Sequence, residues 1–454
     1  MPEDKPPTRQ TSLPSSAFAR GVRLAALPVG FAGRTTLGVG KRLGGAPAEA
    51  VLLEVQRRTA DQIFSVLGQL KGGAMKFGQA MSIFEAALPD EIAGPYRETL
   101  TRLQDAAPPM SPGVVHRVLT KELGTNWREQ LSTFDDVPAA AASIGQVHRA
   151  TWSDGQGSDG IEVAVKIQYP GAAKALRSDL RQVARLSRFF AVIAPAVDVR
   201  GIVEELQERV VEELDYRMEA DSQSIFAAEF ADDPEIVVPR VVAHTEQLLV
   251  STWLESDHSL AEVITNGTQE ERDRYGEAYV RFLFAGPART GLLHADPHPG
   301  NYRIMPDGRL GVVDYGAVAR LPDGVPPEVG QLLRAAVEGD YAAVTQGLRD
   351  TGFLRPGAGL DAEMIERYVS PFVEPASADE FTFSREWMRE QMARIGAPTP
   401  EGMGTALKIN IPRQYVLMHR VWAGGVGVLS QLGATAPFRT ILEENLPGFA
   451  DPVG

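Results

Sequence analysis

One segment of the sequence has the residue types and the spacing of a phosphate-handling loop, namely His294-Ala-Asp-Pro-His-Pro-Gly-Asn301. Phosphoryl transfer needs a group that faces the acceptor and oxygen ligands that hold magnesium. At this Asp-x4-Asn spacing, Asp296 would supply the acid–base group and the Asn301 amide oxygen would bind Mg²⁺. Two prolines and a glycine favour an irregular loop over a helix or a strand.

The same residues have simpler interpretations. In an isolated His-x-Asp sequence, Asp296 would cap a turn and His294 would pack as a core histidine. A transition-metal site at His294 and His298 has no carboxylate at helical spacing to support it. The phosphate interpretation therefore depends on motifs elsewhere in the chain.

Two further motifs would complete such a site. In Val163-Ala-Val-Lys166, strand alternation places Lys166 on the face opposite to the valines, where it could contact ATP phosphates. In Val312-Val-Asp-Tyr-Gly316, an apolar strand leads to Asp314, the predicted principal Mg²⁺ ligand, and Gly316 permits the next turn. Each motif alone has an ordinary structural explanation, but the order of all three predicts chemistry that depends on ATP and Mg²⁺.

The segment before Lys166 is rich in alanine where a protein kinase has a glycine-rich loop. Backbone N–H groups of such a loop can still approach phosphate, although alanine lacks the positive-φ freedom of glycine. No Ala-Pro-Glu signature follows Asp314, which argues against recognition of a peptide substrate. The loop residues predicted to contact phosphate are Ala140, Ala141, Ala142 and Ser143.

Apolar periodicity predicts the elements that would position these motifs. Strands are expected at 143–150, 161–167, 236–242 and 248–254, and helices at 174–190, 202–220 and about 270–290. A hairpin is expected over 302–314, turned by Asp307-Gly308, and helices predominate after 326. This order predicts an α+β, two-lobed protein-kinase-like fold preceded by a helical extension.

The chain is expected to divide into four parts. These are a flexible basic arm (1–46), a helical extension (47–108), a strand-rich N-lobe (109–255) and a helical C-lobe (256–454). The first fifty residues hold seven basic and three acidic side chains, so the arm could contact an anionic membrane or remain a solvated tail.

Composition limits the function classes. With 44% hydrophobic and 23% charged residues, the chain resembles a soluble globular protein. A net charge of −14 argues against general nucleic-acid binding, and the absence of cysteine excludes disulfides and thiol chemistry. The chain lacks a bilayer-length apolar run and an evident signal peptide. We therefore predict a cytoplasmic protein, with peripheral contact at the inner face of the membrane left open.

The motifs from 72 to 321 together resemble the UbiB-type atypical kinases, a family linked to ubiquinone and other isoprenoid-lipid metabolism. The resemblance rests on the alanine-rich loop, the lysine strand followed by Gln-Tyr-Pro-Gly, the Asp296 loop and the Asp314 turn. It also rests on Lys76-Phe-Gly-Gln79 and Glu213-Leu-Asp215, the KxGQ and ExD motifs of that family.

The resemblance implies that Lys76 and Gln79 lie on a helix that covers the active site. A helix over 202–220 would place Asp215 and Glu219 one turn apart, a like-charge pair that needs nearby cations. We assign Glu219 to Lys166, and Glu213 with Asp215 to the KxGQ helix, with the swapped pairing left open.

Two features depart from the family pattern. The chain lacks the C-terminal membrane-spanning helices associated with UbiB, so any membrane contact would be peripheral. The glycine expected after the hinge acid, Glu255, is also absent, although Glu255 is still assigned to adenine binding.

The resemblance implies an atypical kinase or ATPase that binds ATP and Mg²⁺, with a lipid or quinone-like molecule as a further partner. Two alternatives stay open. A small-molecule phosphotransferase of the antibiotic-kinase type would share the Asp-x4-Asn and Asp-x-Gly motifs but have an open acceptor cleft. A non-catalytic pseudokinase scaffold would have no need to retain Lys166, Asp296, Asn301 and Asp314.

Overall fold

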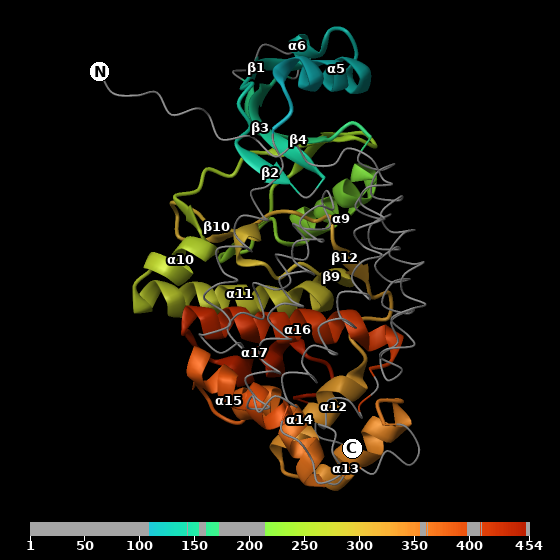
Figure 1. The fold of residues 1–454 in the computed structure, drawn as a ribbon, viewed down its shortest axis with the longest axis vertical. Coiled ribbons are helices and arrows are strands. Elements are labelled where there is room, and N and C mark those ends of the chain that lie inside the picture. The colour runs from blue at the N-terminus through green and yellow to red at the C-terminus, as the bar shows by residue number, and fades with distance from the viewer. Residues whose placement is uncertain are drawn as a thin grey trace, which may run out of the picture. The chain divides into compact units, whose positions relative to one another are not determined.

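The computed structural model describes residues 109–142, 144–153, 160–171, 214–354, 360, 362–396, 409 and 411–450, drawn as coloured ribbon in Figure 1. The basic arm, the helical extension and the helix expected at 174–190 lie outside these residues. So do four residues with predicted roles, Lys76, Gln79, Ser143 and Glu213.

The N-lobe is built on a six-stranded antiparallel sheet with the strand order β1-β3-β4-β7-β6, in which β2 pairs with β3. Its strands are β1 (Leu131–Phe134), β2 (Ala140–Ala142), β3 (Gly145–Trp152), β4 (Ile161–Gln168), β6 (Val241–His244) and β7 (Leu248–Thr252). The strands expected at 143–150, 161–167 and 248–254 are therefore confirmed. The one expected at 236–242 is divided into β5 (Ile236–Val237), which joins another sheet, and β6.

Strand alternation in β4 sets the position of the key lysine. Val163, Val165 and Ile167 are fully buried and pack on α5 (Pro112–Leu123) and α6 (Trp127–Gln130), which cover one face of the sheet. Lys166 points to the opposite face because successive strand side chains alternate.

Helix α9 (Tyr216–Glu229) corrects the continuous helix expected over 202–220. Its N-cap is Asp215, which has extended dihedral angles (φ −124°, ψ 100°) and whose carboxylate accepts a hydrogen bond from the Arg217 N–H. Aspartate competes well for orphan N–H groups at a helix start, so the helix begins after Asp215 and does not run through it. Glu219 then lies in the first turn, where the helix dipole favours a negative charge.

The C-lobe is mainly helical. Its helices are α10 (Leu260–Asn266), α11 (Gln269–Thr290), α12 (Pro327–Val337), α13 (Tyr341–Asp350), α14 (Ala362–Ala376), α15 (Arg385–Gly396), α16 (Arg413–Leu432) and α17 (Phe438–Asn445). Figure 1 shows α11 and α16 running side by side, and the main hydrophobic core forms between them and their neighbours. Among the described residues, no helix is both long and apolar enough to cross a membrane.

Short strands connect the helices to the predicted loops. They are β8 (His258–Ser259), β9 (Leu292–His294), β10 (Tyr302–Ile304), β11 (Leu310–Val312), β12 (Val318–Arg320), β13 (Phe381–Thr382) and β14 (Thr435–Ala436), with a 3₁₀ turn at Pro299–Asn301. The hairpin expected over 302–314 is confirmed, since β10 pairs with β11 and Gly308 occupies a left-handed conformation (φ 84°) at its turn.

A buried hydrogen-bond network holds β3 against the start of the N-lobe. The Gln146 amide oxygen accepts from the Met110 N–H, so its nitrogen donates to His148 Nε2 (2.8 Å), and His148 Nδ1 donates to the Asp135 carbonyl (2.7 Å). This arrangement uses the neutral imidazole of a fully buried side chain. Burial lowers the pKa of His148, although its bond to the Asp135 carbonyl acts in the opposite direction.

The neutral His148 makes stability depend on pH. Below about pH 6.5 the unfolded chain binds a proton that the folded protein resists, so we expect stability to fall as the pH falls, by up to about 1.4 kcal/mol per pH unit. Denaturant unfolding at pH 7.5 and 5.5 should show a smaller pH effect in His148→Gln than in the unmodified chain. Parallel pH dependences in the two proteins would contradict this assignment.

Candidate nucleotide site

The site centres on the ammonium group of Lys166. Its Nζ lies 2.6 Å from Glu219 Oε1 and 3.1 Å from Asp314 Oδ1. These residues come from β4, from the first turn of α9 and from the loop after β11, so the fold joins three separate parts of the chain. Lys166 thus pairs with Glu219, as the sequence led us to expect, and the catalytic role of the pair stays a prediction.

Burial makes this ion group electrostatically strong. The side chains of Lys166 and Glu219 are only 13% and 4% exposed. Burial alone would lower the pKa of Lys166, but the Asp314 and Glu219 carboxylates outweigh it and raise that pKa above its ordinary value. The lysine therefore stays a cation, which is the charge that a phosphate group requires.

Asp314 adopts a backbone conformation that suits a functional turn. Among the described residues it is the one non-glycine residue with a left-handed φ, at 65°. Aspartate visits this region more readily than most residues, because its short side chain can bond locally, and here Oδ1 accepts from the Gly316 N–H (3.3 Å). The turn directs the carboxylate back toward Lys166.

The His294–Asn301 loop is tied directly to the Asp314 turn. His294 Nε2 donates to the Asp314 carbonyl (3.0 Å), and the Val313 N–H donates to the Asn301 carbonyl (2.9 Å). Pairing of β9 with β12 adds a second connection. The fold therefore brings the two motifs together as one unit.

His294 is a packed histidine, as the simpler interpretation held, and it also orders the site. It is 2% exposed, and its ring meets that of Tyr315 edge to face, with the ring centres 5.2 Å apart. His298 Nδ1 accepts from the Gly300 N–H and so caps the 3₁₀ turn. The described part of the chain holds no group of three or more His, Asp or Glu residues placed to bind a metal.

The oxygen donors nevertheless fit a Mg²⁺ ion that is shared with phosphate. Mg²⁺ commonly takes one or two protein carboxylates, with waters and phosphate oxygens completing its shell. The Asn301 amide nitrogen donates to the Asp296 carbonyl (3.3 Å), so the amide oxygen is the atom that would serve as a Mg²⁺ ligand. A Cβ at Gly316 would lie 3.2 Å from both Asp314 Oδ1 and Glu219 Oε2, so glycine keeps space beside these carboxylates.

The alanine-rich segment forms a strand where a loop was expected. Ala140–Ala142 pair with β3 in a tight hairpin, in which Ala142 lies opposite Gly145. Glycine is required at Gly145, where a Cβ would lie 2.2 Å from the Ile167 carbonyl oxygen. The contact of Ala140, Ala141 and Ala142 with phosphate stays a prediction.

Two other predicted residues have local partners. The Glu255 side chain is 65% exposed, and its carboxylate lies 2.8 Å from Arg149 Nη2. The role of Glu255 in adenine binding stays a prediction. In that role, backbone groups around Glu255 would contact the adenine ring. The Asp215 carboxylate bonds to Arg217 (2.9 Å), and its pairing with the KxGQ helix is likewise untested.

Sequence reasoning missed two supporting contacts. The Lys166 ammonium lies 5.3 Å from the ring centre of Tyr216, which is a cation–π contact. The one sequence signal for it is that Tyr216 directly follows the ExD motif. Arg420 of α16 donates to the carbonyl of Ala295, next to Asp296 (3.1 Å). No local pattern links residues so far apart in the chain.

A strand lysine paired with a helix glutamate, followed by an Asp-x4-Asn loop and an Asp-x-Gly turn, defines a protein-kinase-like fold. A family model described as the ABC1 atypical kinase-like domain matches residues 102–348, more than half of the chain. The chain belongs to this family, and the resemblance to UbiB-type atypical kinases is confirmed.

Individual relatives agree with this assignment. The chain is 27% identical to the mitochondrial atypical kinase COQ8B of Danio rerio over 94% of this chain and 68% of that protein. It is 26% identical to the mitochondrial atypical kinase COQ8 of Saccharomyces cerevisiae, over 97% and 87% of the two chains. A solved structure described as the Rv3197–erythromycin complex of Mycobacterium tuberculosis is 42% identical, with a TM-score of 0.68, over 89% of this chain and 100% of that one.

A double-mutant cycle tests the strength of the central pair. We expect Lys166→Met and Glu219→Gln to show a coupling of about 1–3 kcal/mol in the free energy of unfolding, because the pair is buried. The control is the more exposed pair of Arg439 and Glu443 on α17 (3.0 Å), for which the Met and Gln substitutions should couple by less than about 0.5 kcal/mol. Equal couplings in the two cycles would contradict the buried ion group.

Proposed function

We propose that the protein is an atypical kinase or ATPase that depends on ATP and Mg²⁺ and acts in isoprenoid-lipid or quinone-related metabolism. The observation that carries the proposal is the placement of Lys166 between the Glu219 and Asp314 carboxylates. In this arrangement the Lys166 ammonium is held beside the Asp314 carboxylate, the proposed Mg²⁺ ligand. Catalysis of phosphoryl transfer depends mainly on such fixed charges around the phosphate groups.

Each residue has a role in this proposal. Lys166 binds the phosphates and is positioned by Glu219. Asp314 and Asn301 would hold Mg²⁺, which neutralises phosphate charge when it is bound. Asp296 is 8% exposed and accepts the proton of the attacking hydroxyl, which belongs to an acceptor molecule or to water. Backbone N–H groups of 140–143 approach the phosphates, and the hinge around Glu255 contacts adenine.

The KxGQ extension is proposed to cover the acceptor side of the site. Lys76 and Gln79, with Glu213 and Asp215 as their partners, would close the groove in which kinases bind peptides. A covered site favours slow turnover and a small acceptor or water, and it argues against an ordinary protein kinase.

The metabolic setting is proposed from the relatives. Several of them are named as mitochondrial atypical kinases, and one as a chloroplastic kinase, ACTIVITY OF BC1 COMPLEX KINASE 1, from Arabidopsis thaliana. We propose a lipid or quinone-like partner and a cytoplasmic protein that contacts the inner face of the membrane peripherally through its basic arm.

A macrolide is a second candidate ligand. The observation that favours it is the 42% identical relative described as an erythromycin complex. Small-molecule phosphotransfer would also use Asp296 as the base, but it would require an open acceptor side. A pseudokinase scaffold is less well supported, because Lys166, Asp296, Asn301 and Asp314 are all present and the described geometry gathers them.

ATP turnover by the full chain tests the proposal, with and without anionic liposomes that carry an isoprenoid quinone. We expect Lys166→Ala to lower turnover by roughly 10²–10³-fold, because a preorganised cation is lost. The matched control is Lys121→Ala, an exposed lysine on α5 that should keep full activity. Full activity in Lys166→Ala would refute the proposal, and stimulation by erythromycin in place of the quinone would favour the second candidate.

A further inference from the structure

The backbone around Asp296 is held by three side chains. Residues 295–298 lie in neither a helix nor a strand, so no helical or sheet ladder satisfies their carbonyls. The carbonyls of residues 295, 296 and 297 each accept a hydrogen bond from a side chain instead. The donors are, in that order, Arg420 Nη2 (3.1 Å), Asn301 Nδ2 (3.3 Å) and Tyr279 Oη (2.8 Å). Since buried carbonyls need partners, these bonds hold the loop in one conformation.

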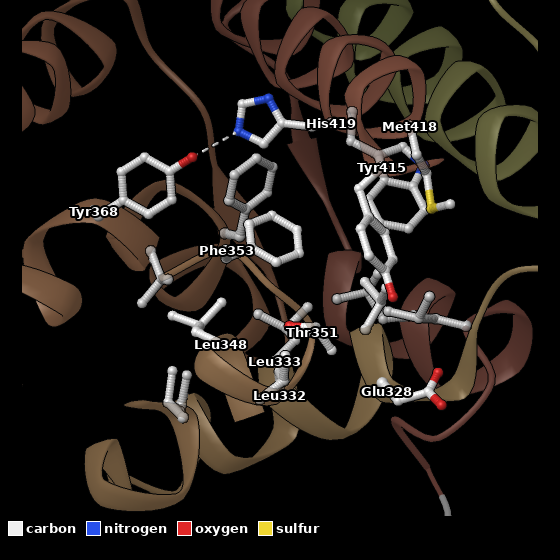
Figure 2. Close-up of a pocket in the computed structure, with 18 of the residues that line it drawn as sticks. Glu328, Leu332, Leu333, Leu348, Thr351, Phe353, Tyr368, Tyr415, Met418 and His419 are labelled. Carbon is white, nitrogen blue, oxygen red and sulfur yellow. Dashed lines mark hydrogen bonds between the residues drawn. The ribbon is translucent and has the colours of Figure 1, made fainter. Parts of the chain in front are cut away.

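Two of the donors belong to long helices of the C-lobe core. Tyr279 lies on α11 and is fully buried. Arg420 lies on α16, the helix that runs beside α11 in Figure 1. Its neighbours Met418 and His419 line an apolar pocket of the C-lobe (Figure 2), and Arg420 is not part of that lining. Arg420 therefore leaves α16 on another side, where its guanidinium reaches the loop.

These bonds fix the direction in which the Asp296 side chain leaves the backbone. Each peptide unit is planar, so a hydrogen bond to its carbonyl orients the whole unit. The carbonyl of Ala295 belongs to the peptide unit before the Asp296 Cα, and the carbonyl of Asp296 belongs to the unit after it. With both units held, the bond from Cα to Cβ of Asp296 keeps one direction. Tyr279 holds the next peptide unit in the same way.

Arg420 has the properties that such a contact needs. Its donor is charged, and hydrogen bonds from charged donors are stronger than those between neutral groups. Within the described part of the chain, no ion pair engages its guanidinium, so the loop carbonyl is its partner there. Its backbone lies in a packed helix, because the next residue, Val421, is fully buried in the main core. Groups carried by helices are held more precisely than groups carried by loops.

We propose that Arg420 and Tyr279 are positioning residues for Asp296. They hold the backbone before and after Asp296, so that its carboxylate keeps the direction that proton transfer from the attacking hydroxyl requires. A misplacement of about 1 Å at a reacting group can lower a rate by about 10²-fold. This inference rests on the proposed function, in which Asp296 is the base, and it adds two residues that lie outside the sequence motifs.

Steady-state ATP turnover by the full chain, combined with calorimetric ATP binding, tests the inference. Arg420→Met should lower kcat by about 10–100-fold and leave the affinity for Mg-ATP unchanged, because the residues that bind phosphate stay in place. Arg420→Lys keeps a charged donor and should recover part of the rate. The matched control is Arg334→Met, which removes another arginine–carbonyl bond of the C-lobe (3.2 Å, to Phe449) and should leave kcat unchanged.

A double variant shows whether Arg420 acts through Asp296. Asp296→Asn should lower kcat by itself, and the addition of Arg420→Met should cause no further loss, since the group to be positioned is already gone. An unchanged kcat in Arg420→Met, or its full effect in the double variant, would overturn the inference and leave the proposed function standing. Full turnover in Asp296→Asn would instead contradict the proposed function.

Thermal unfolding shows whether each variant is folded. If Arg420→Met does not unfold cooperatively, Tyr279→Phe takes its place, because it removes only the hydroxyl that holds the Pro297 carbonyl. Tyr279→Phe should also lower kcat at an unchanged affinity for Mg-ATP. An unchanged kcat, or a loss of rate that follows a loss of ATP affinity, would overturn the positioning role.

Discussion

The buried ammonium of Lys166 is the interaction on which the rest of the site depends. A lone buried charge is costly, whereas two carboxylates at 2.6 and 3.1 Å make the same burial tolerable. The lysine and its two partners lie far apart in the chain. The ion group therefore forms only when β4, α9 and the turn after β11 are packed together. For this reason the site is complete only in the folded protein.

A second constraint fixes the other half of the site. The left-handed backbone of Asp314 costs some free energy, about 1–2 kcal/mol for a typical residue, and the surrounding contacts must hold it. The hydrogen bond from His294, the pairing of β9 with β12 and the buried ring of Tyr315 supply those contacts. The strained backbone at Asp314 is therefore part of the turn that directs its carboxylate toward Lys166.

Local patterns predicted much of this arrangement. Alternation placed Lys166 on its strand face, and the Asp-Gly turn located the hairpin between the two motifs, because both signals act over a few residues. The start of α9 was not predictable from periodicity, since an N-cap aspartate also fits a helical pattern. The Arg420 contact and the C-lobe pocket arise from helices that meet only in the tertiary structure, and no spacing within the chain encodes them.

Calorimetric titration of ATP, with and without Mg²⁺, into the unmodified chain, Asp314→Asn and Asp296→Asn tests whether Asp314 is the principal Mg²⁺ ligand. Asparagine tolerates a left-handed backbone, so the first substitution removes the charge and spares the turn. We predict that Mg²⁺ strengthens ATP binding in the unmodified chain and in Asp296→Asn, and that this effect is lost in Asp314→Asn. An undiminished Mg²⁺ effect in Asp314→Asn would contradict the assignment of Asp314 as the principal ligand and, with it, the proposed site.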